Sequence, residues 1–268
     1  MKNYYLMNNL VIGNTSQLSN YFPDNFLKIS SRNINYTHIL NKNWDRVFIC
    51  LGESRKFIDN INLHDEINFN LTMDIIDKLK LISNKIIIYS TCELWNQYDG
   101  PIDLQMKFKF FETPYSNSKH KITDFILKNI EKYSNVIILY PFNFNSTYRN
   151  NDFLFGKIFN SIINKTQVEI GDTYFYRDMI HPSLVVKESI NSNSHKIIGS
   201  GRLTYVNDFI RDLYKNYNLD YESLVIENNN KFNEYDRKKE YYLKSDICQY
   251  SYSELLKDTI NDINKQIK

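Results

Sequence analysis

Short apolar runs of strand length alternate with segments of helical spacing, and this alternation constrains the fold of the 268-residue chain more than any other feature. The runs are rich in β-branched residues and apolar on both faces, which is typical of parallel strands buried between helices. Right-handed crossovers place such helices on both faces of one sheet. The sequence therefore predicts an α/β fold with a doubly wound parallel sheet. The predicted strands are Asn9–Ile12, Phe26–Ser30, Arg46–Leu51, Lys85–Ser90 and Asn135–Tyr140.

Apolar residues recur at helical spacing between and after these strands. The predicted helices begin at Leu18 or cover residues 70–81, 116–133, 153–164 and 207–214. After about residue 150 the alternation loosens, and a short strand is predicted at Val168–Ile170. We therefore expect residues 1–150 to form a dinucleotide-type sheet domain. Residues 151–268 are expected to form a smaller C-terminal lobe that is interleaved with this core.

Charge, hydropathy and cysteine content exclude several classes of function. The 33 basic and 31 acidic residues leave a net charge of +2, which gives no broad basic surface for nucleic acid or an anionic membrane. Apolar runs such as residues 86–89 are far shorter than the roughly 18 residues that span a bilayer. Cys50, Cys92 and Cys248 form no CxxC pair, so neither a disulfide framework nor a metal site is expected. A reducing, cytoplasmic location is the simplest interpretation.

Small residues recur in the turn after the first strand, at Gly13, Ser16 and Ser19. This is the spacing of a GxxGxxG turn, in which backbone amides and a helix N-terminus approach a pyrophosphate. Similar turns occur in α/β proteins that bind no dinucleotide, so the turn alone is a weak signal. It makes Gly13, Ser16, Gln17 and Leu18 candidate cofactor ligands.

The end of the second strand indicates which dinucleotide would bind. Ser31 and Arg32 stand there, and no Asp or Glu occurs between Phe26 and Trp44. NAD-binding folds usually place a carboxylate at this point, whereas an arginine accommodates the 2′-phosphate of NADP. The sequence therefore favours NADP over NAD, although a solvated loop arginine would look the same.

Tyr115 and Lys119 lie four residues apart at the start of the predicted 116–133 helix, so they share one face. An ammonium beside a phenol favours the phenolate, and such a tyrosine can act as acid or base on a sugar hydroxyl or ketone. Thr91, at the end of the preceding strand, can share that proton and hold the substrate oxygen. In a chain with 21 tyrosines this spacing also arises by chance in surface pairs. Its place after the fourth strand favours a catalytic group.

Together these motifs resemble the extended short-chain dehydrogenase/reductase family, the NAD(P)-dependent nucleotide-sugar epimerases, dehydratases and reductases. The resemblance covers nearly the whole chain, and Asn70 stands where the family often has an asparagine before a helix. Further matching segments are residues 47–55 after the third strand, 112–115 before the tyrosine, 141–143, the RDxxH segment at 177–181 and the glycine turn at 198–202. The resemblance implies a Rossmann fold with a substrate lobe, an NADP cofactor, a nucleotide-diphosphate sugar as substrate and a homodimer as candidate assembly.

The resemblance also implies site residues. The implied catalytic residues are Thr91, Glu93, Tyr115 and Lys119. The implied cofactor-binding residues are Gly13, Ser16, Gln17, Leu18, Ser31, Arg32, Leu51, Gly52, Tyr115, Lys119 and Pro141. The candidate substrate-binding residues are Asn143, Arg149, Arg177, His181 and Arg237. Guanidinium groups suit diphosphate oxygens, but a surface salt bridge would explain each arginine equally well.

The segment Ser90-Thr-Cys-Glu93 resembles the STSE segment of GDP-mannose dehydratases and nucleotide-sugar decarboxylases. By that resemblance Glu93 would remove the C5 proton once Tyr115 and NADP⁺ have produced a 4-ketone. This favours a 4,6-dehydratase or epimerase with hydride transfer at C4. The compact length favours instead an NADPH-dependent 4-keto-sugar reductase. A non-catalytic NADP-binding scaffold is a third reading, because a fold alone does not prove activity.

Overall fold

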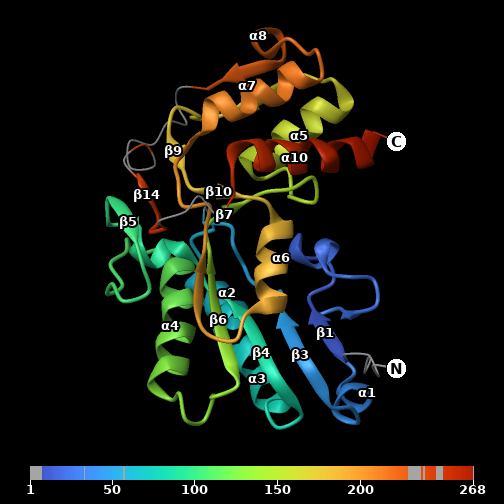
Figure 1. Cartoon of the computed structure of the whole chain (residues 1–268), viewed down its shortest axis with the longest axis vertical. Helices are drawn as coiled ribbons and strands as arrows, with labels where there is room; N and C mark the ends of the chain where they lie inside the picture. Colours follow the sequence, from blue (N-terminus) through green and yellow to red (C-terminus); the bar gives the residue numbers. More distant parts are fainter. Residues whose placement is uncertain are drawn as a thin grey trace. The chain divides into compact units, whose positions relative to one another are not determined.

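The computed structural model describes residues 8–32, 34–56, 58–228, 237, 239–245 and 250–267. Its central feature is a six-stranded sheet of order β11-β6-β4-β3-β1-β2, which confirms the predicted α/β class (Figure 1). β1 pairs in parallel with β2 and β3, β3 with β4, and β4 with β6. The sheet strands are β1 (Asn9–Ile12), β2 (Leu27–Ile29), β3 (Trp44–Ile49), β4 (Ser83–Tyr89), β6 (Val136–Pro141) and β11 (Lys196–Ile198).

The strand order reverses at β1, because the chain runs outward to β2 on one side and to β3, β4 and β6 on the other. The carboxyl ends of β1 and β3 are therefore a topological switch point, where open α/β sheets bind their ligands. Gly13 follows β1 at this edge, and Cys50 follows β3. The sheet topology thus directs attention to the two turns that the sequence motifs singled out.

Helices cover both faces of the sheet. The Tyr89 hydroxyl donates to Ser189 Oγ of α6 (Pro182–Asn191) at 2.9 Å. The next residue, Ser90, shares a hydrogen bond of 2.9 Å with Thr123 of α4 (Pro114–Lys128). Consecutive residues of an extended chain point to opposite faces. α6 and α4 therefore lie on opposite sides of β4.

The predicted helix after β1 is a four-residue 3-10 helix, η1 (Leu18–Tyr21), so the expectation of a full helix there was wrong. Phe22 is extended (φ −72°, ψ 146°), as the residue before Pro23 prefers to be. The Ser19 hydroxyl also donates to the Ser16 carbonyl at 2.8 Å. Such side-chain bonds to the backbone compete with helical ones. The next crossover is also short, with α1 (Tyr36–Leu40) between β2 and β3.

The predicted helix over residues 70–81 begins earlier than expected. α2 (Ile61–Asp65), the π-helical segment η2 (Glu66–Leu71) and α3 (Thr72–Leu79) follow one another without a break. α2 and η2 both pack against α4. π-helical turns are uncommon and are often found near functional sites.

The chain divides into two compact units. Unit 1 comprises Met1–Leu94, Phe110–Tyr140 and Val186–Lys196, and unit 2 comprises Trp95–Lys109, Pro141–Val185 and Ile197–Lys268. Unit 1 contains most of the sheet and is completed by its last segment, since His195 Nδ1 accepts a hydrogen bond of 3.0 Å from the Ile138 amide. Each unit is thus built from separate stretches of the chain.

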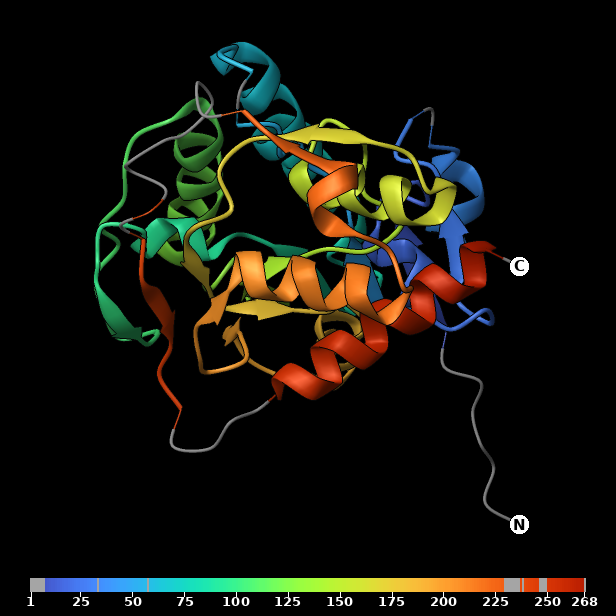
Figure 2. The ribbon, with the colours of Figure 1, turned by 90° about the horizontal axis from the view of Figure 1, so that it is seen from above.

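Unit 2 consists of helices and two-stranded pairs. Its long helices α7 (Val206–Asn216) and α10 (Tyr252–Ile267) lie side by side (Figures 1 and 2). The parallel pairs are β5 (Gly100–Ile102) with β14 (Tyr241–Leu243), β7 (Asn143–Phe144) with β10 (Met179–Ile180), and β8 (Val168–Ile170) with β13 (Val225–Glu227). β9 (Tyr176–Arg177) and β12 (Thr204–Tyr205) pair antiparallel. The remaining elements are η3 (Cys92–Trp95), where the two units meet in sequence, and, in unit 2, α5 (Leu154–Asn164) and α8 (Tyr221–Leu224).

Across the described ranges, no helix is long and apolar enough to cross a membrane. Nor do the described side chains include a group of three or more His, Cys, Asp or Glu that could hold a metal ion. Cys50 and Cys92 are buried free thiols, and Cys248 lies outside the described residues.

Candidate active site

The start of α4 fixes the position of Tyr115. Pro114 occupies the first turn of the helix, where its missing amide costs nothing. Thr113 Oγ1 accepts a hydrogen bond of 3.1 Å from the Ser116 amide, and Ser116 Oγ accepts one of 2.9 Å from the Thr113 amide. This capping box defines where the helix begins. Tyr115 is therefore held in the first turn, and Lys119 lies one turn further along.

Thr91 and Glu93 lie beside Tyr115 in unit 1. Thr91 follows β4 and lies close enough to the Tyr115 phenol to lower its pKa, and its Oγ1 accepts a hydrogen bond of 3.2 Å from the Glu93 amide. Thr91 and Glu93 are only 6% and 7% exposed. Burial raises the pKa of Tyr115, while Thr91 and the charge of Lys56 oppose that rise. The structure therefore brings together three of the four predicted catalytic side chains.

Lys119 is buried, and its Nζ donates to the Tyr89 carbonyl at 2.9 Å. Burial lowers the pKa of Lys119 to about 8. Its contact is thus with the end of β4, and the cation whose charge lowers the pKa of Tyr115 in this structure is Lys56. A Cβ built on Gly52 would stand 3.2 Å from Lys119 Nζ, so the glycine leaves the ammonium approachable from that side.

Lys56 is a site residue that the motifs did not identify. Its Nζ lies 2.5 Å from Glu93 Oε1 and 6.0 Å from the centre of the Tyr115 ring. The neighbouring Arg55 pairs instead with Glu53, at 2.6 Å. A cluster of charged residues directly after the β3 strand was visible in the sequence. Which of them would face Tyr115 depends on how the turn folds.

Asn68, not Asn70, is the asparagine that the fold uses before α3. Asn68 is 1% exposed, its Nδ2 donates to the Glu53 carbonyl at 3.0 Å and to Ser118 Oγ at 2.9 Å, and its Oδ1 accepts the Glu53 amide at 2.9 Å. Asn70 donates to Glu66 on an exposed part of the same segment. The structure therefore gives the buried contacts to Asn68, whereas Asn70, which the resemblance singled out, makes an exposed one.

The turn after β1 requires a glycine at its first position. Gly13 has a φ of +103°, and a Cβ there would stand 2.7 Å from the Cys50 carbonyl oxygen. The Gly13 and Asn14 amides both donate to the Ile29 carbonyl, at 2.9 and 3.0 Å. The Ser19 hydroxyl closes the turn by donating to the Asn14 carbonyl at 2.7 Å. Ser19, at the third small position of the motif, therefore stabilises the turn through its hydrogen bond to the turn's own backbone.

The other predicted cofactor residues of unit 1 stand around the switch point. Gln17 and Leu18 are buried, Ser31 and Leu51 are half-buried, and Arg32 is exposed. The room that Gly52 leaves beside Lys119 and the small residues of the Gly13 turn suit the close approach of a dinucleotide. The four-residue η1 offers it no full helix dipole. On balance these residues fit a nicotinamide dinucleotide.

The predicted substrate residues, and Pro141, all belong to unit 2. The Arg149 guanidinium stacks 3.6 Å from the Phe153 ring, and Arg177 lies 4.3 Å over Phe175. Arg237 forms a two-pronged ion pair with Asp172.

His181 is 2% exposed and its ring nitrogens bond to Ser183 Oγ at 2.8 Å and Asp262 Oδ2 at 3.0 Å. Asn143 is half-buried in β7 and pairs in register with Met179. The structure thus gives His181 and the three arginines contacts within unit 2, and their binding to a substrate remains a prediction.

Asp178 explains why the RDxxH segment and the later glycine turn occur together. It is fully buried and accepts hydrogen bonds from the amides of Ser200 at 2.7 Å, Gly201 at 3.3 Å and Leu243 at 3.0 Å. A Cβ on Gly199 would stand 2.6 Å from Asp178 Oδ2. Asp178 therefore has a structural role, which the sequence motif did not distinguish from a functional one.

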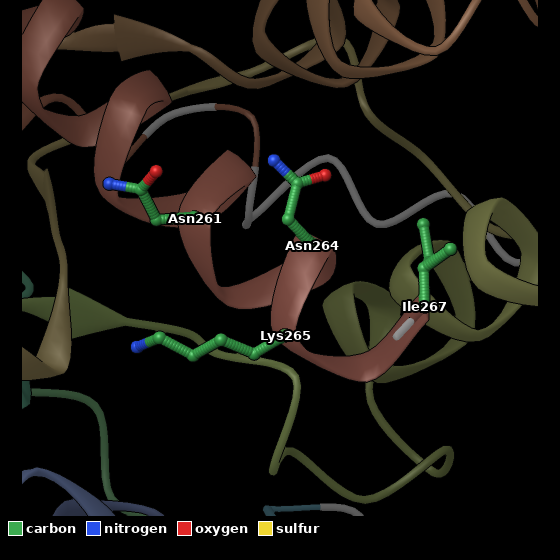
Figure 3. Close-up of a pocket in the computed structure, with 4 residues that line it drawn as sticks. All are labelled: Asn261, Asn264, Lys265 and Ile267. Carbon is green, nitrogen blue, oxygen red and sulfur yellow. The ribbon is translucent and has the colours of Figure 1, made fainter.

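A cavity of about 570 Å³ lies along α10, lined by Asn261, Asn264, Lys265 and Ile267 (Figure 3). None of these is a predicted site residue. Asn264 Oδ1 accepts the Tyr217 hydroxyl at 2.9 Å, and Lys265 pairs with Asp262 at 3.3 Å. These contacts stabilise α10.

No protein-family model matches the chain, and no curated protein matches it in sequence. Solved structures do match it over nearly its whole length. UDP-glucose 4-epimerase from Thermotoga maritima, solved with UDP-glucose, is 17% identical with a TM-score of 0.77, and the match covers 98% of this chain and 100% of that one. dTDP-glucose 4,6-dehydratase from Bacillus anthracis, in complex with NAD, is 14% identical with a TM-score of 0.73 over 97% of each chain.

RMD from Pseudomonas aeruginosa, complexed with NADPH, is 14% identical with a TM-score of 0.75, over 97% of this chain and 100% of that one. Identities this low establish the fold and not the reaction. The chain has the Rossmann fold of the extended short-chain dehydrogenases, the fold of nucleotide-sugar epimerases and dehydratases.

Proposed function

We propose that this chain is an NADP-dependent oxidoreductase that transfers a hydride at C4 of a nucleotide-diphosphate sugar. The observation that carries the proposal is that Thr91, Tyr115 and the buried Glu93 lie together after β4 and at the start of α4. They belong to a chain whose fold matches that of enzymes solved with UDP-glucose, NAD or NADPH. A scaffold protein would have no need of a half-buried phenol held beside a buried hydroxyl and a buried carboxylate.

A bound nicotinamide dinucleotide supplies the donor or acceptor of the hydride. In the proposal Gly13, Ser16, Gln17 and Leu18 would hold its pyrophosphate. Arg32 and Ser31 would bind the 2′-phosphate, for which a guanidinium is suited. Leu51, Gly52 and Lys119 would line the nicotinamide end, and Pro141 is a further predicted cofactor residue.

The chain's own residues handle the protons. Tyr115 would take the proton from the C4 hydroxyl, or return it to a C4 ketone, while Thr91 holds the same oxygen. Glu93 would act as a base at the neighbouring C5 once C4 is a ketone, because a ketone acidifies the adjacent C–H bond. This role would make the enzyme a 4,6-dehydratase or an epimerase.

Two observations favour a second candidate, a 4-keto-sugar reductase. Burial raises the pKa of Tyr115, so at neutral pH the phenol is protonated, which is the form that donates to a ketone. Glu93 is engaged with Lys56 at 2.5 Å, and a reductase needs no base at C5. The two candidates share the site and differ in the direction of proton transfer.

A screen of nucleotide sugars and their 4-keto forms, each with NADP⁺ and with NADPH, tests the proposal by mass spectrometry. Loss of water indicates a dehydratase, an unchanged mass at a new retention time an epimerase, and a gain of two hydrogens a reductase. We expect Tyr115→Phe to lower kcat by about 10²- to 10⁴-fold while leaving cofactor affinity nearly unchanged. Tyr36→Phe, at a half-exposed tyrosine of α1, is the matched control.

Wild-type turnover in Tyr115→Phe would remove the acid–base assignment. If the wild-type chain converts no substrate and binds no cofactor, the proposed function is wrong. Binding of NADP without any turnover would favour the non-catalytic scaffold.

A further inference from the structure

A partly exposed lysine covers a buried carboxylate in the candidate site. The Lys56 side chain is 45% exposed, whereas the Glu93 side chain is 9% exposed, and their charged atoms lie 2.5 Å apart. Lys56 follows β3 and Glu93 follows β4, so the pair joins the ends of two adjacent strands. An ion pair this close, with one partner buried, is better shielded from solvent than an ordinary surface pair.

The proposed chemistry would bring two negative charges close together in the site. Glu93 and the phenolate form of Tyr115 would be two anions side by side, and like charges disfavour each other's ionised form. The groups that face Tyr115 come from several elements. Cys92 and Glu93 lie in η3, and both raise the pKa of Tyr115. Thr91 and Lys56 lower it.

The remaining neighbours do not offset this repulsion. The His64 ring of α2 meets the Tyr115 ring edge-on at 6.3 Å, and His64 is fully buried. Lys119 lies on the same helix as Tyr115, but its Nζ donates to the Tyr89 carbonyl. Lys56 Nζ is 6.0 Å from the centre of the Tyr115 ring. Among these groups it is the cation that pairs with the carboxylate and whose charge lowers the pKa of Tyr115.

We propose that Lys56 is a positioning residue of this site, whose ammonium holds Glu93 in place and neutralises its charge beside the Tyr115 ring. The catalytic consequence rests on the proposed function. The charge compensation itself exists in the chain without substrate, so it can be measured directly.

The test is a titration of the full-length protein labelled with ¹³C at the tyrosine ring carbon that bears the hydroxyl, followed by NMR. The Tyr115 signal is assigned as the one that disappears in Tyr115→Phe. In Lys56→Met, which keeps the aliphatic stem, we expect the Tyr115 midpoint to move to higher pH, because Glu93 is no longer neutralised. In Glu93→Gln we expect it to move to lower pH.

The double variant Lys56→Met/Glu93→Gln removes both charges and leaves no buried charge unpaired. We expect its Tyr115 midpoint to return toward the wild-type value, and Lys56→Arg to keep that value. Lys121→Ala is the matched control, since Lys121 lies on α4, is 47% exposed and pairs with Asp65 at 2.6 Å. An unmoved midpoint in Lys56→Met, or a double variant that stays displaced in the direction of Lys56→Met, would overturn the proposal.

Kinetics separates this inference from the proposed function. If hydride transfer at C4 is found, Lys56→Met should lower kcat more than it raises KM, and Lys56→Arg should recover most of the loss. If no nucleotide sugar is converted, the proposed function fails while the titration still decides the charge compensation. An increase in KM with kcat unchanged would assign Lys56 to substrate binding and contradict the positioning role.

Discussion

Lys119 is buried, so its charged ammonium form destabilises the folded chain. It is 7% exposed, and burial brings its pKa from 10.5 to about 8. Between these two values the unfolded chain binds a proton that the folded chain does not. Stability therefore rises with pH through this interval, as the sign of proton linkage requires. A lysine kept at such a site serves some purpose other than stability.

The measurement compares Lys119→Met with the wild type by urea unfolding at about pH 7 and about pH 9.5. Methionine does not titrate, so the wild type should gain stability relative to the variant by about 2 kcal/mol as the pH rises, from about 1.36 kcal/mol per pH unit above pH 8. Other ionisable groups change both proteins alike and cancel in the difference. A difference that does not depend on pH would show that Lys119 is charged in the folded state.

The closeness of Thr91, Glu93 and Tyr115 could be predicted, because their places relative to a strand end and a helix start are local properties of the sequence. Lys119 lies one turn beyond Tyr115, as its spacing requires, but its ammonium contacts the Tyr89 carbonyl. Lys56 and Asn68 could not be predicted in this way. Their contacts, with Glu93 and with Ser118, join segments that only the fold brings together.

At the scale of elements, the π-helical segment η2 depends on one buried side chain. Asn68 binds both the amide and the carbonyl of Glu53 and the hydroxyl of Ser118. It thereby joins η2 to the turn after β3 and to α4. Removing a buried partner leaves the other groups unsatisfied, which costs more than the net value of the bonds.

Asn68→Ala should therefore lower the free energy of unfolding by roughly 1–3 kcal/mol. Asn70→Ala is the matched control, because Asn70 lies two residues away and its bond to Glu66 is exposed. The control should change stability by less than about 0.5 kcal/mol. Equal losses in the two variants, measured by urea unfolding, would show that Asn68 has no special role.

The elements that were predicted well have long stripes of apolar residues, such as α4, α5 and α7. η1 was overpredicted because its apolar spacing continues up to Pro23, which ends the helix. β11 has three residues, too few for a periodic signal. The helix α10 could have been predicted, since Leu256, Ile260 and Ile263 recur at helical spacing.

At the scale of the whole molecule, a ligand that binds the folded chain stabilises all of it by mass action. At about 100 times the dissociation constant the gain is roughly 2.7 kcal/mol. If Arg32 faces the 2′-phosphate, NADP(H) should raise the melting temperature more than NAD(H) at equal concentration. Arg32→Ala should reduce that difference, while Lys42→Ala, at an exposed lysine over the Trp44 ring, should preserve it. Equal shifts with both dinucleotides would contradict the preference for NADP.

The order in which the chain is made has a consequence for the interleaved units. As the polypeptide leaves the ribosome, residues 1–140 emerge without the stretch that supplies Ser189 to Tyr89 and His195 to the Ile138 amide. Until residues 186–198 have been translated, β6 has no β11 beside it and one face of β4 lacks α6. A fragment cut near residue 150 would keep that edge of β6 uncovered permanently, and nascent-chain holding factors are the natural protection for it during synthesis.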